Sequence, residues 1–237
     1  MGCALNFSVC SGELMAIVGI NGIGKSTLLR TLGNVQPKLS GSIHVDDTPI
    51  EHYSQAQLAQ KISVVLTEPL ASKNMTVWEL VALGRQPYTN WIGNLSANDI
   101  HKINDALALV EIMPLKERPC YELSDGQLQR TLIARALAQD TSIMLLDEPT
   151  THLDLYHKAH VLTLLKSIAH QTQKAILFTT HEIDLAIQLC DTMLLMEKDT
   201  MHFGQPCELI ASKTFESIFP EDTIQFDATT GSFRIIK

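Results

Sequence analysis

The segment GINGIGKST, Gly19–Thr27, constrains the fold of this 237-residue chain more than any other feature. It fits the pattern GxxxxGK[ST] and follows the apolar run LMAIVG at 14–19. Glycines let the backbone turn around an anion with its N–H groups inward, and a helix that begins near Lys25 adds the positive end of its dipole. The segment therefore predicts a phosphate-binding loop between a strand and a helix, whereas its glycine spacing does not fit the GxGxxG pattern of a dinucleotide site.

Each polar residue of this loop has an expected partner. Lys25 can reach the β- and γ-phosphates of a nucleotide, the hydroxyl of Ser26 can bind Mg²⁺, and Thr27 can reach the α-phosphate. The residues expected to bind the phosphates are Gly19, Asn21, Gly22, Gly24, Lys25, Ser26 and Thr27.

Five short apolar runs predict the strands of a sheet. They are continuous rather than alternating, which is typical of parallel strands covered on both faces, and helical segments lie between them. The runs are 14–19, 62–66, 142–148, 175–180 and 192–196. The fold class is therefore expected to be α/β.

The middle of the chain is expected to be helical. Thr76 with Glu79 forms a capping box, and Ser96 with Asp99 offers a similar helix start. Ile100, Ile103, Leu107 and Val110 are expected on one side of the second helix, and LSDGQLQR at 123–130 opens another. The chain is thus expected to form one domain, 1–237, with an α/β core at about 1–75 and 140–237 and a helical subdomain at about 76–139.

Two acids follow the strand predicted in SIMLLDE. Asp147, at the carboxyl end of that strand, can hold Mg²⁺, usually through water. Glu148 can accept a proton from an attacking water. Two acids after a strand alone are more often the start of a solvated loop, but the phosphate-binding loop upstream favours the catalytic interpretation.

A third strand ends in TTHE, which places His181 at the same edge of the sheet. A lone histidine is more often structural than catalytic, but this position favours a γ-phosphate contact. The net charge of −8 argues against a nucleic-acid partner, because phosphate backbones attract basic surfaces. No apolar run approaches the roughly 20 residues that span a bilayer.

Together these segments resemble the nucleotide-binding subunit of an ATP-binding cassette (ABC) transporter. GINGIGKST corresponds to Walker A, LSDGQ to the signature, SIMLLDE to Walker B, TTHLD to the D-loop and TTHE to the switch histidine. The resemblance implies a RecA-like P-loop NTPase core with an inserted helical subdomain. It also implies ATP and Mg²⁺ as cofactors, and hydrolysis with Lys25, Glu148 and His181 as catalytic residues.

The same resemblance implies partners. A head-to-tail homodimer would hold two ATP molecules, with Ser124, Gly126 and Gln127 of one subunit on ATP bound by the other, and with Asp154 in cross-dimer communication. ELVALGRQPY at 79–88 and DEPTTHLDL resemble importers of iron–siderophore, heme or cobalamin. A membrane permease, a substrate-binding protein acting indirectly, and a peripheral place on the cytoplasmic face of the inner membrane are therefore expected.

Two other functions stay open at this point. One is an ABC ATPase of another class, which acts on another transport substrate, on DNA or on ribosomes. The other is a nucleotide-sensing subunit with weak hydrolysis. The acidic single cassette argues against the first, and the full set of catalytic residues argues against the second.

Three departures from the family pattern bear on mechanism. Thr67, followed by Glu68, stands where a glutamine usually contacts Mg²⁺, so Thr67 becomes the candidate ligand there. Only eighteen residues precede Gly19, and no aromatic residue fits the adenine-stacking position, because Phe7 is too close and lies in an expected strand. Asp125 replaces the first glycine of the signature, and we expect it to face away from nucleotide.

His152, His157 and His160 form a cluster near the D-loop, and a solvated helix face explains them better than a metal site. Trp78, Tyr88 and Trp91 lie in the helical subdomain. They are candidates for contact with a membrane subunit, although core packing explains at least some of them.

Overall fold

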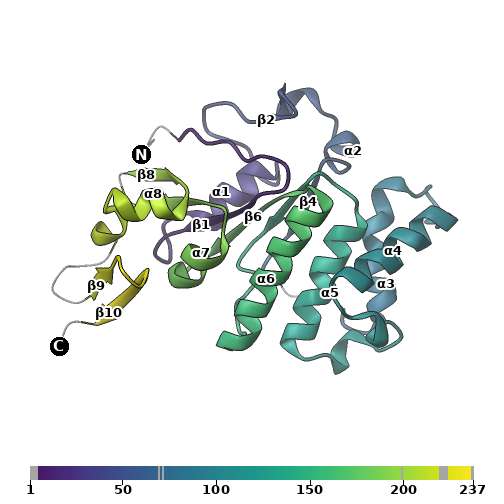
Figure 1. The fold of residues 1–237 in the computed structure, drawn as a ribbon. Helices are drawn as coiled ribbons and strands as arrows, with labels where there is room; N and C mark the ends of the chain where they lie inside the picture. The colour runs from purple at the N-terminus through teal and green to yellow at the C-terminus, as the bar shows by residue number, and fades with distance from the viewer. Residues whose placement is uncertain (1–4, 69, 71, 199, 219–223, 236–237) are drawn as a thin grey trace.

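The computed structural model describes residues 5–68, 70, 72–198, 200–218 and 224–235. Its centre is a six-stranded sheet in the order β4-β5-β6-β1-β7-β8, whose neighbours are parallel except for the β7–β8 pair (Figure 1). The strands are β1 (Leu14–Val18), β4 (Ile62–Val65), β5 (Ile143–Leu146), β6 (Ala175–Thr180), β7 (Thr192–Met196) and β8 (Met201–Gly204). The five apolar runs predicted as strands are therefore confirmed.

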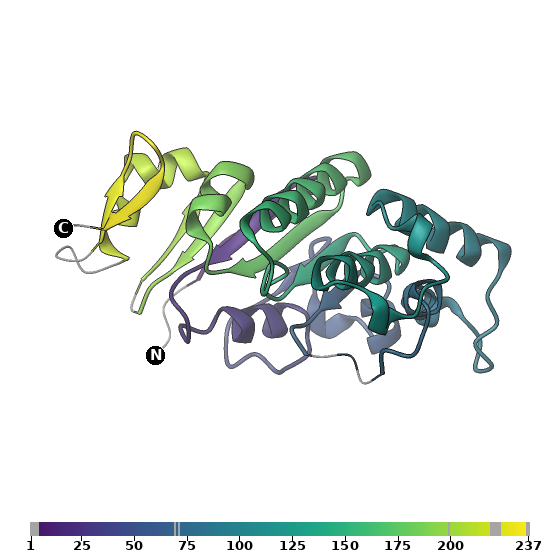
Figure 2. The ribbon, with the colours of Figure 1, turned by 90° about the horizontal axis from the view of Figure 1, so that it is seen from below.

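Alternate residues of the central strand β1 face two separate apolar layers. Met15 and Ile17 pack with Leu29 of α1 (Lys25–Leu32), while Leu14 and Ala16 pack with Leu162 on the other face. The second face is covered by α6 (Leu155–Thr172) and α7 (Ile183–Leu189), and Figure 2 shows these helices and α1 on opposite sides of the sheet. Burial on both faces explains why the strands are apolar throughout.

Helices fill the segment between β4 and β5, as expected. They are α3 (Val77–Ala82), η2 (Leu83–Tyr88), α4 (Ala97–Leu109), η3 (Met113–Leu115), η4 (Cys120–Glu122) and α5 (Asp125–Ala138). The capping boxes that begin at Thr76 and Ser96 are both present. The apolar cluster on the α6 face of the sheet includes residues of α3, α4 and α5. The sheet and the helical segment therefore share one core.

One residue of the predicted apolar side of α4 does not join the core. Ile103, Leu107 and Val110 are fully buried, but Ile100 remains 43% exposed. Ile100 lies in the first turn of the helix, where the neighbouring elements leave that side open to solvent.

An ion pair is buried inside the helical segment. Arg85 Nε lies 2.8 Å from Asp99 Oδ1, with side chains 3% and 6% exposed, and Arg85 also donates to the carbonyl of Ala138. The hydroxyl and backbone N–H of Ser96 donate to the other oxygen of Asp99. These bonds, followed by the guanidinium, lower the pKa of Asp99 to about 2 in spite of its burial.

We expect Arg85→Met to lower the free energy of unfolding by about 3–5 kcal/mol, because it leaves the Asp99 carboxylate buried without its cation.

The contribution of Asp99 to stability depends on pH. Since the folded pKa of Asp99 lies below its ordinary value of 3.8, the ionised carboxylate stabilises the fold fully above that pH. This stabilisation is lost as the pH falls towards 2. Urea unfolding between pH 5 and pH 2, compared with Asp99→Asn, measures this loss.

The control for Arg85→Met is Lys102→Met, which breaks an ion pair with Asp140 that is more than one-third exposed. We expect that change to cost at most about 1 kcal/mol, as exposed pairs do. An equal loss of stability in both variants would contradict the importance of burial at Arg85.

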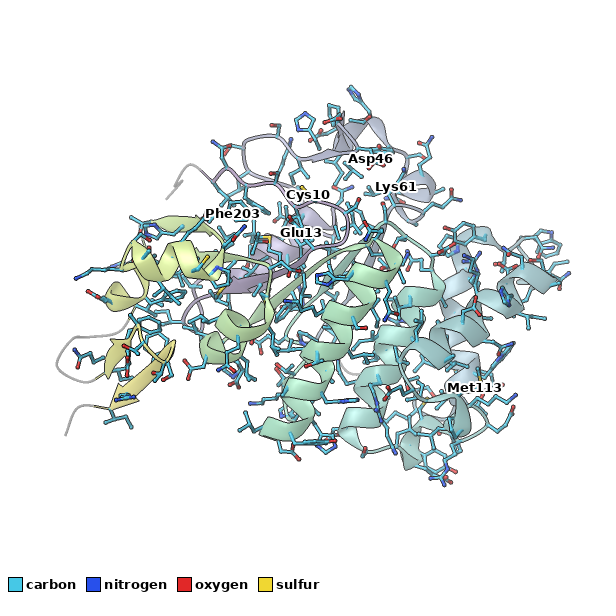
Figure 3. All side chains as sticks on the ribbon, in the orientation of Figure 1. Cys10, Glu13, Asp46, Lys61, Met113 and Phe203 are labelled. Atoms are coloured by element: carbon cyan, nitrogen blue, oxygen red, sulfur yellow. The ribbon has the colours of Figure 1, made fainter. Side chains whose placement is uncertain are left out.

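Smaller elements surround the sheet. On the α1 side lie β2 (His44–Val45), β3 (Thr48–Pro49), η1 (Ile50–His52) and α2 (Gln55–Leu58). Lys61 Nζ lies 2.6 Å from Asp46, which ties the β2–β3 turn to the start of β4 (Figure 3). At the other end lie α8 (Pro206–Ala211), η5 (Thr214–Ser217), β9 (Ile224–Asp227) and β10 (Ser232–Ile235). None of the helices in the described ranges is both long and apolar enough to cross a membrane.

The expectation that Phe7 lies in a strand is wrong. The described residues from Leu5 to Cys10 have no strand pairing. The ring of Phe7 instead packs at a tilt against Phe203 of β8, with 5.8 Å between centroids. Leu5 and Val9 pack against the apolar cluster on the α1 side of the sheet, so the segment is apolar without a strand partner.

Candidate nucleotide site

The phosphate-binding loop joins the centre of the sheet to α1. Gly19 has φ 153°, and a Cβ there would lie 2.5 Å from the carbonyl oxygen of Met196, so a side chain cannot be accommodated. Gly24 caps α1 in the left-handed region, at φ 108°. The close approach at Gly19 and the left-handed backbone at Gly24 explain why the motif requires glycine at these two positions.

Lys25 is folded into the loop that precedes it. Its side chain is largely buried, and Nζ donates to the carbonyl oxygens of Gly19 at 2.8 Å and Ile20 at 3.2 Å. Burial lowers the pKa of Lys25, while the charges of Glu148 and Asp147 oppose this shift. A cation is therefore held beside the acids that follow β5.

Asp147 gathers three hydroxyl groups. Its Oδ1 accepts from Ser26 and from Thr179, each at 2.7 Å, and Thr67 Oγ1 lies 3.5 Å from Oδ2. The Asp147 side chain is almost fully buried. A carboxylate with hydroxyl oxygens suits a hard cation, so these residues fit Mg²⁺. The structure thus brings together Ser26, Asp147 and Thr67, the three residues proposed for the metal.

The residue beside Thr67 faces elsewhere. Glu68 lies 3.0 Å from Arg30 of α1 and is mostly exposed. Of Thr67 and Glu68, Thr67 is therefore the one directed at Asp147, a candidate metal ligand.

Glu148 and His181 lie together next to this cluster. Glu148 has a left-handed backbone, φ 46°, and its N–H donates to Thr179 Oγ1 at 2.9 Å. The hydroxyl of Thr151 donates to Oε2 at 3.0 Å, and Oε1 lies 3.9 Å from Nδ1 of His181. Thr151 therefore holds one oxygen of the Glu148 carboxylate, while the other oxygen lies next to the imidazole of His181.

The signature segment begins α5, whereas the phosphate-binding loop leads into α1. Ser124 and Gln127 form a capping box at the start of α5, and Asp125 between them is exposed. In the described part of the chain, no hydrogen bond or ion pair joins Ser124, Gly126 or Gln127 to the loop Gly19–Thr27. Within one subunit, these residues therefore have no direct polar contact with the loop.

The D-loop residue Asp154 caps α6. It accepts from the N–H of His157 at 2.9 Å, and this bond leads the lowering of its pKa. The His157 ring lies 2.9 Å from both carboxylate oxygens and 3.4 Å from the position of a Cβ on Gly126. His157 thus fills the space between the D-loop and the signature helix.

The other residues of the histidine cluster and the tryptophans have separate surroundings. His160 lies 3.7 Å from Glu111 and 3.4 Å from Arg130. Among the described residues, no three His, Cys, Asp or Glu side chains are placed to hold a metal ion. Trp78 packs on the core, whereas Trp91 is 94% exposed.

Sequence reasoning missed the threonine that links the two acids. Thr179 binds both Asp147 and the backbone of Glu148 because β6 lies next to β5. The only sequence signal was the pair of threonines before His181, and its meaning depends on the register of the sheet. Glu182 and Lys158, next to the site, were missed as well.

The loop after the central strand, the acids after β5 and the helices between β4 and β5 define the class of the protein. It is a P-loop nucleoside triphosphatase of the cassette type, with a helical segment inserted into a parallel sheet. A profile described as ABC transporter matches residues 4–151, and the chain belongs to that family. It is an ATPase of the family.

Relatives and solved structures agree with this assignment. The petrobactin import ATP-binding protein of Bacillus anthracis is 37% identical over 91% of this chain and 79% of its own length. The achromobactin transport ATP-binding protein of Dickeya dadantii is 37% identical over 92% and 81%. An inward-facing ABC transporter assigned to the metal-chelate type has 31% identity, covers 91% of this chain and 80% of its own, and has a TM-score of 0.79.

Proposed function

We propose that this chain is the ATP-hydrolysing subunit of an importer that takes up an iron chelate, heme or cobalamin through a membrane permease. The names of the similar proteins support iron-chelate import over action on DNA or ribosomes. The observation that carries the hydrolytic part is the cluster of Ser26, Thr179 and Asp147, with Lys25 and Glu148 beside it. Such a subunit would bind peripherally at the cytoplasmic face of the membrane.

Each residue has a role in this proposal. The loop N–H groups and Lys25 bind the β- and γ-phosphates, and Ser26, Asp147 and Thr67 hold Mg²⁺. Bound Mg²⁺ would neutralise charge on the phosphate oxygens. Glu148 accepts a proton from the water that attacks the γ-phosphate, and His181 positions that phosphate.

A homodimer would complete the site, because no hydrogen bond or ion pair among the described residues joins the signature to the loop within one subunit. Ser124, Gly126 and Gln127 would reach ATP bound by the partner subunit, and Asp154 would face the same interface. Leu155 and Tyr156, which follow Asp154, are 70% and 74% exposed. Apolar side chains of this size beside the D-loop are suited to burial against a second copy.

Asp125→Gly tests how the acid in the signature is oriented. Because Asp125 is exposed in the first turn of α5, where the helix dipole favours an acid, we expect ATP-dependent dimerisation to change by less than about twofold. Light scattering with a Glu148→Gln background, which would slow hydrolysis, measures the dimer. A much stronger dimer would mean that Asp125 repels phosphate. Ser124→Ala serves as the comparison and is expected to weaken the dimer.

A groove of about 450 Å³ offers a surface for the permease. It lies where α2 and β4 meet η2 and α5, and its lining includes Ala59, Val64, Leu83, Pro87 and Ala136. Leu83 is 44% exposed there. Gln86, Arg135 and Gln139 add polar groups to the lining. A groove between the two parts of the chain would let a permease segment sense their relative movement.

The test is reconstitution of this chain with a candidate permease of the metal-chelate type. ATP-driven uptake of ferric siderophores, heme and cobalamin into proteoliposomes would be measured, with Glu148→Gln as the inactive control. The Leu83→Glu variant should lose permease binding while its own ATPase activity remains. If the wild-type complex hydrolyses no more ATP than the Glu148→Gln complex, the proposed hydrolytic role is wrong. Hydrolysis coupled to none of the three substrates would disprove the proposed cargo.

A further inference from the structure

His181 lies between two carboxylates, only one of which belongs to the proposed catalytic set. Nδ1 is 3.9 Å from Glu148 Oε1, and Nε2 is 3.3 Å from Oε1 of Glu182, the next residue in the chain. The imidazole is 43% exposed, so packing alone does not hold it. The contact of Nε2 with Glu182 is therefore available to direct the ring.

Glu182 is itself held from another helix. Lys158, in the first turn of α6, forms an ion pair with the same oxygen that faces His181. The side chains of Lys158 and Glu182 are only 21% and 25% exposed. The N–H of Glu182 donates to Thr180 Oγ1 at 3.0 Å, and its carbonyl accepts from Ala186 in α7. Both the backbone and the side chain of Glu182 are thus fixed.

Lys158 also compensates the negative charge of Glu182. An unpaired carboxylate next to His181 would repel the γ-phosphate that the imidazole is proposed to contact. The ammonium of Lys158 compensates that charge, so Glu182 can orient the ring without opposing nucleotide. Lys158 directly follows His157 in α6, and His157 contacts the D-loop residue Asp154.

We propose that Glu182, held by Lys158, is a positioning residue for His181 in ATP hydrolysis. It keeps the imidazole in the orientation that places Nδ1 towards Glu148. This inference rests on the proposed role of His181 at the γ-phosphate. The first turn of α6 then supports two parts of the site, the D-loop through His157 and the switch histidine through Lys158.

Steady-state kinetics of the 237-residue chain test the proposal. Glu182→Gln should lower kcat about three- to tenfold and leave the KM for ATP within about twofold, because it misdirects a group without removing a phosphate contact. Lys158→Met should lower kcat as well, and Lys158→Arg should restore it. An unchanged kcat in Glu182→Gln, or a lower KM with a higher kcat, would overturn the proposal.

A charge exchange separates positioning from simple stabilisation. Lys158→Glu combined with Glu182→Lys should restore the ion pair and the Tm, but it places an ammonium beside the imidazole. We therefore expect kcat to stay low in the exchanged variant. Recovery of kcat together with the Tm would show that the pair acts only on stability, and the proposal would be wrong.

Two further variants complete the design. Lys166→Met removes a comparable pair on the same helix, Lys166 with Asp191 at 3.2 Å, and should leave kcat unchanged. In a His181→Ala background, Glu182→Gln should have no further effect on kcat. If His181→Ala alone retains full activity, the proposed role of His181 fails. If His181→Ala is impaired but Glu182→Gln is not, only the positioning inference fails.

Discussion

Glu148→Gln is expected to lower kcat for ATP hydrolysis by about 10²–10⁴-fold, the range that general base catalysis contributes. The amide keeps the size of the side chain and can still accept from Thr151, but it cannot take a proton from water. ATP binding should change little, because Glu148 is not among the groups proposed to bind phosphate. Phosphate release and nucleotide binding measure the two effects separately.

The matched control is Glu117→Gln. Glu117 is a mostly exposed glutamate in the helical segment whose ion pair with Lys116 is loose, at 3.8 Å. It should hydrolyse ATP like the wild type. Retained hydrolysis in Glu148→Gln would show that another group activates the water.

Lys25→Met should weaken ATP binding by about ten- to a hundredfold. A hydrogen bond to a charged group contributes about 1.5–3 kcal/mol, and each 1.4 kcal/mol is tenfold in affinity. Lys25 is largely buried, at the start of α1, and the charges of Glu148 and Asp147 act on it. Methionine fills the same space without charge, so fluorescent ATP titration reports the loss of the ammonium.

Lys213→Met is the control for that titration. Lys213 is three-quarters exposed and pairs only loosely with Glu216, at 3.9 Å. Equal affinities for ATP in the two variants would mean that the loop N–H groups alone bind the phosphates.

Much of the fold could be predicted because its signals are local. The strands are continuous apolar runs, and each capping box is formed by residues within a four-residue segment, as at Thr76 and Ser124. Asp147 and Glu148 could be placed because parallel strands end at one edge of a sheet. The family pattern supplied the order of the motifs.

What could not be predicted depends on segments far apart in the chain. Thr179 reaches Asp147 across 32 positions, and Lys158 reaches Glu182 across 24. Such contacts follow from strand order and helix packing rather than from spacing. The expected strand at Phe7 was wrong for a related reason, since the ring of Phe7 packs on the side chain of Phe203 and the segment has no strand partner.

β6 lies between β1 and β5 in the sheet, so the loop after β1 and the acids after β5 meet at the carboxyl end of β6. Ser26, directly after Lys25, reaches Asp147 across this strand at 2.7 Å, and Thr179 of β6 binds the same carboxylate oxygen. In the proposed function, a nucleotide held by the loop would therefore lie over the end of β6, with its last phosphate towards Glu148. Backbone pairing in the sheet, rather than any one side chain, thus sets the spacing between the residues that would bind ATP and the residue that would activate water.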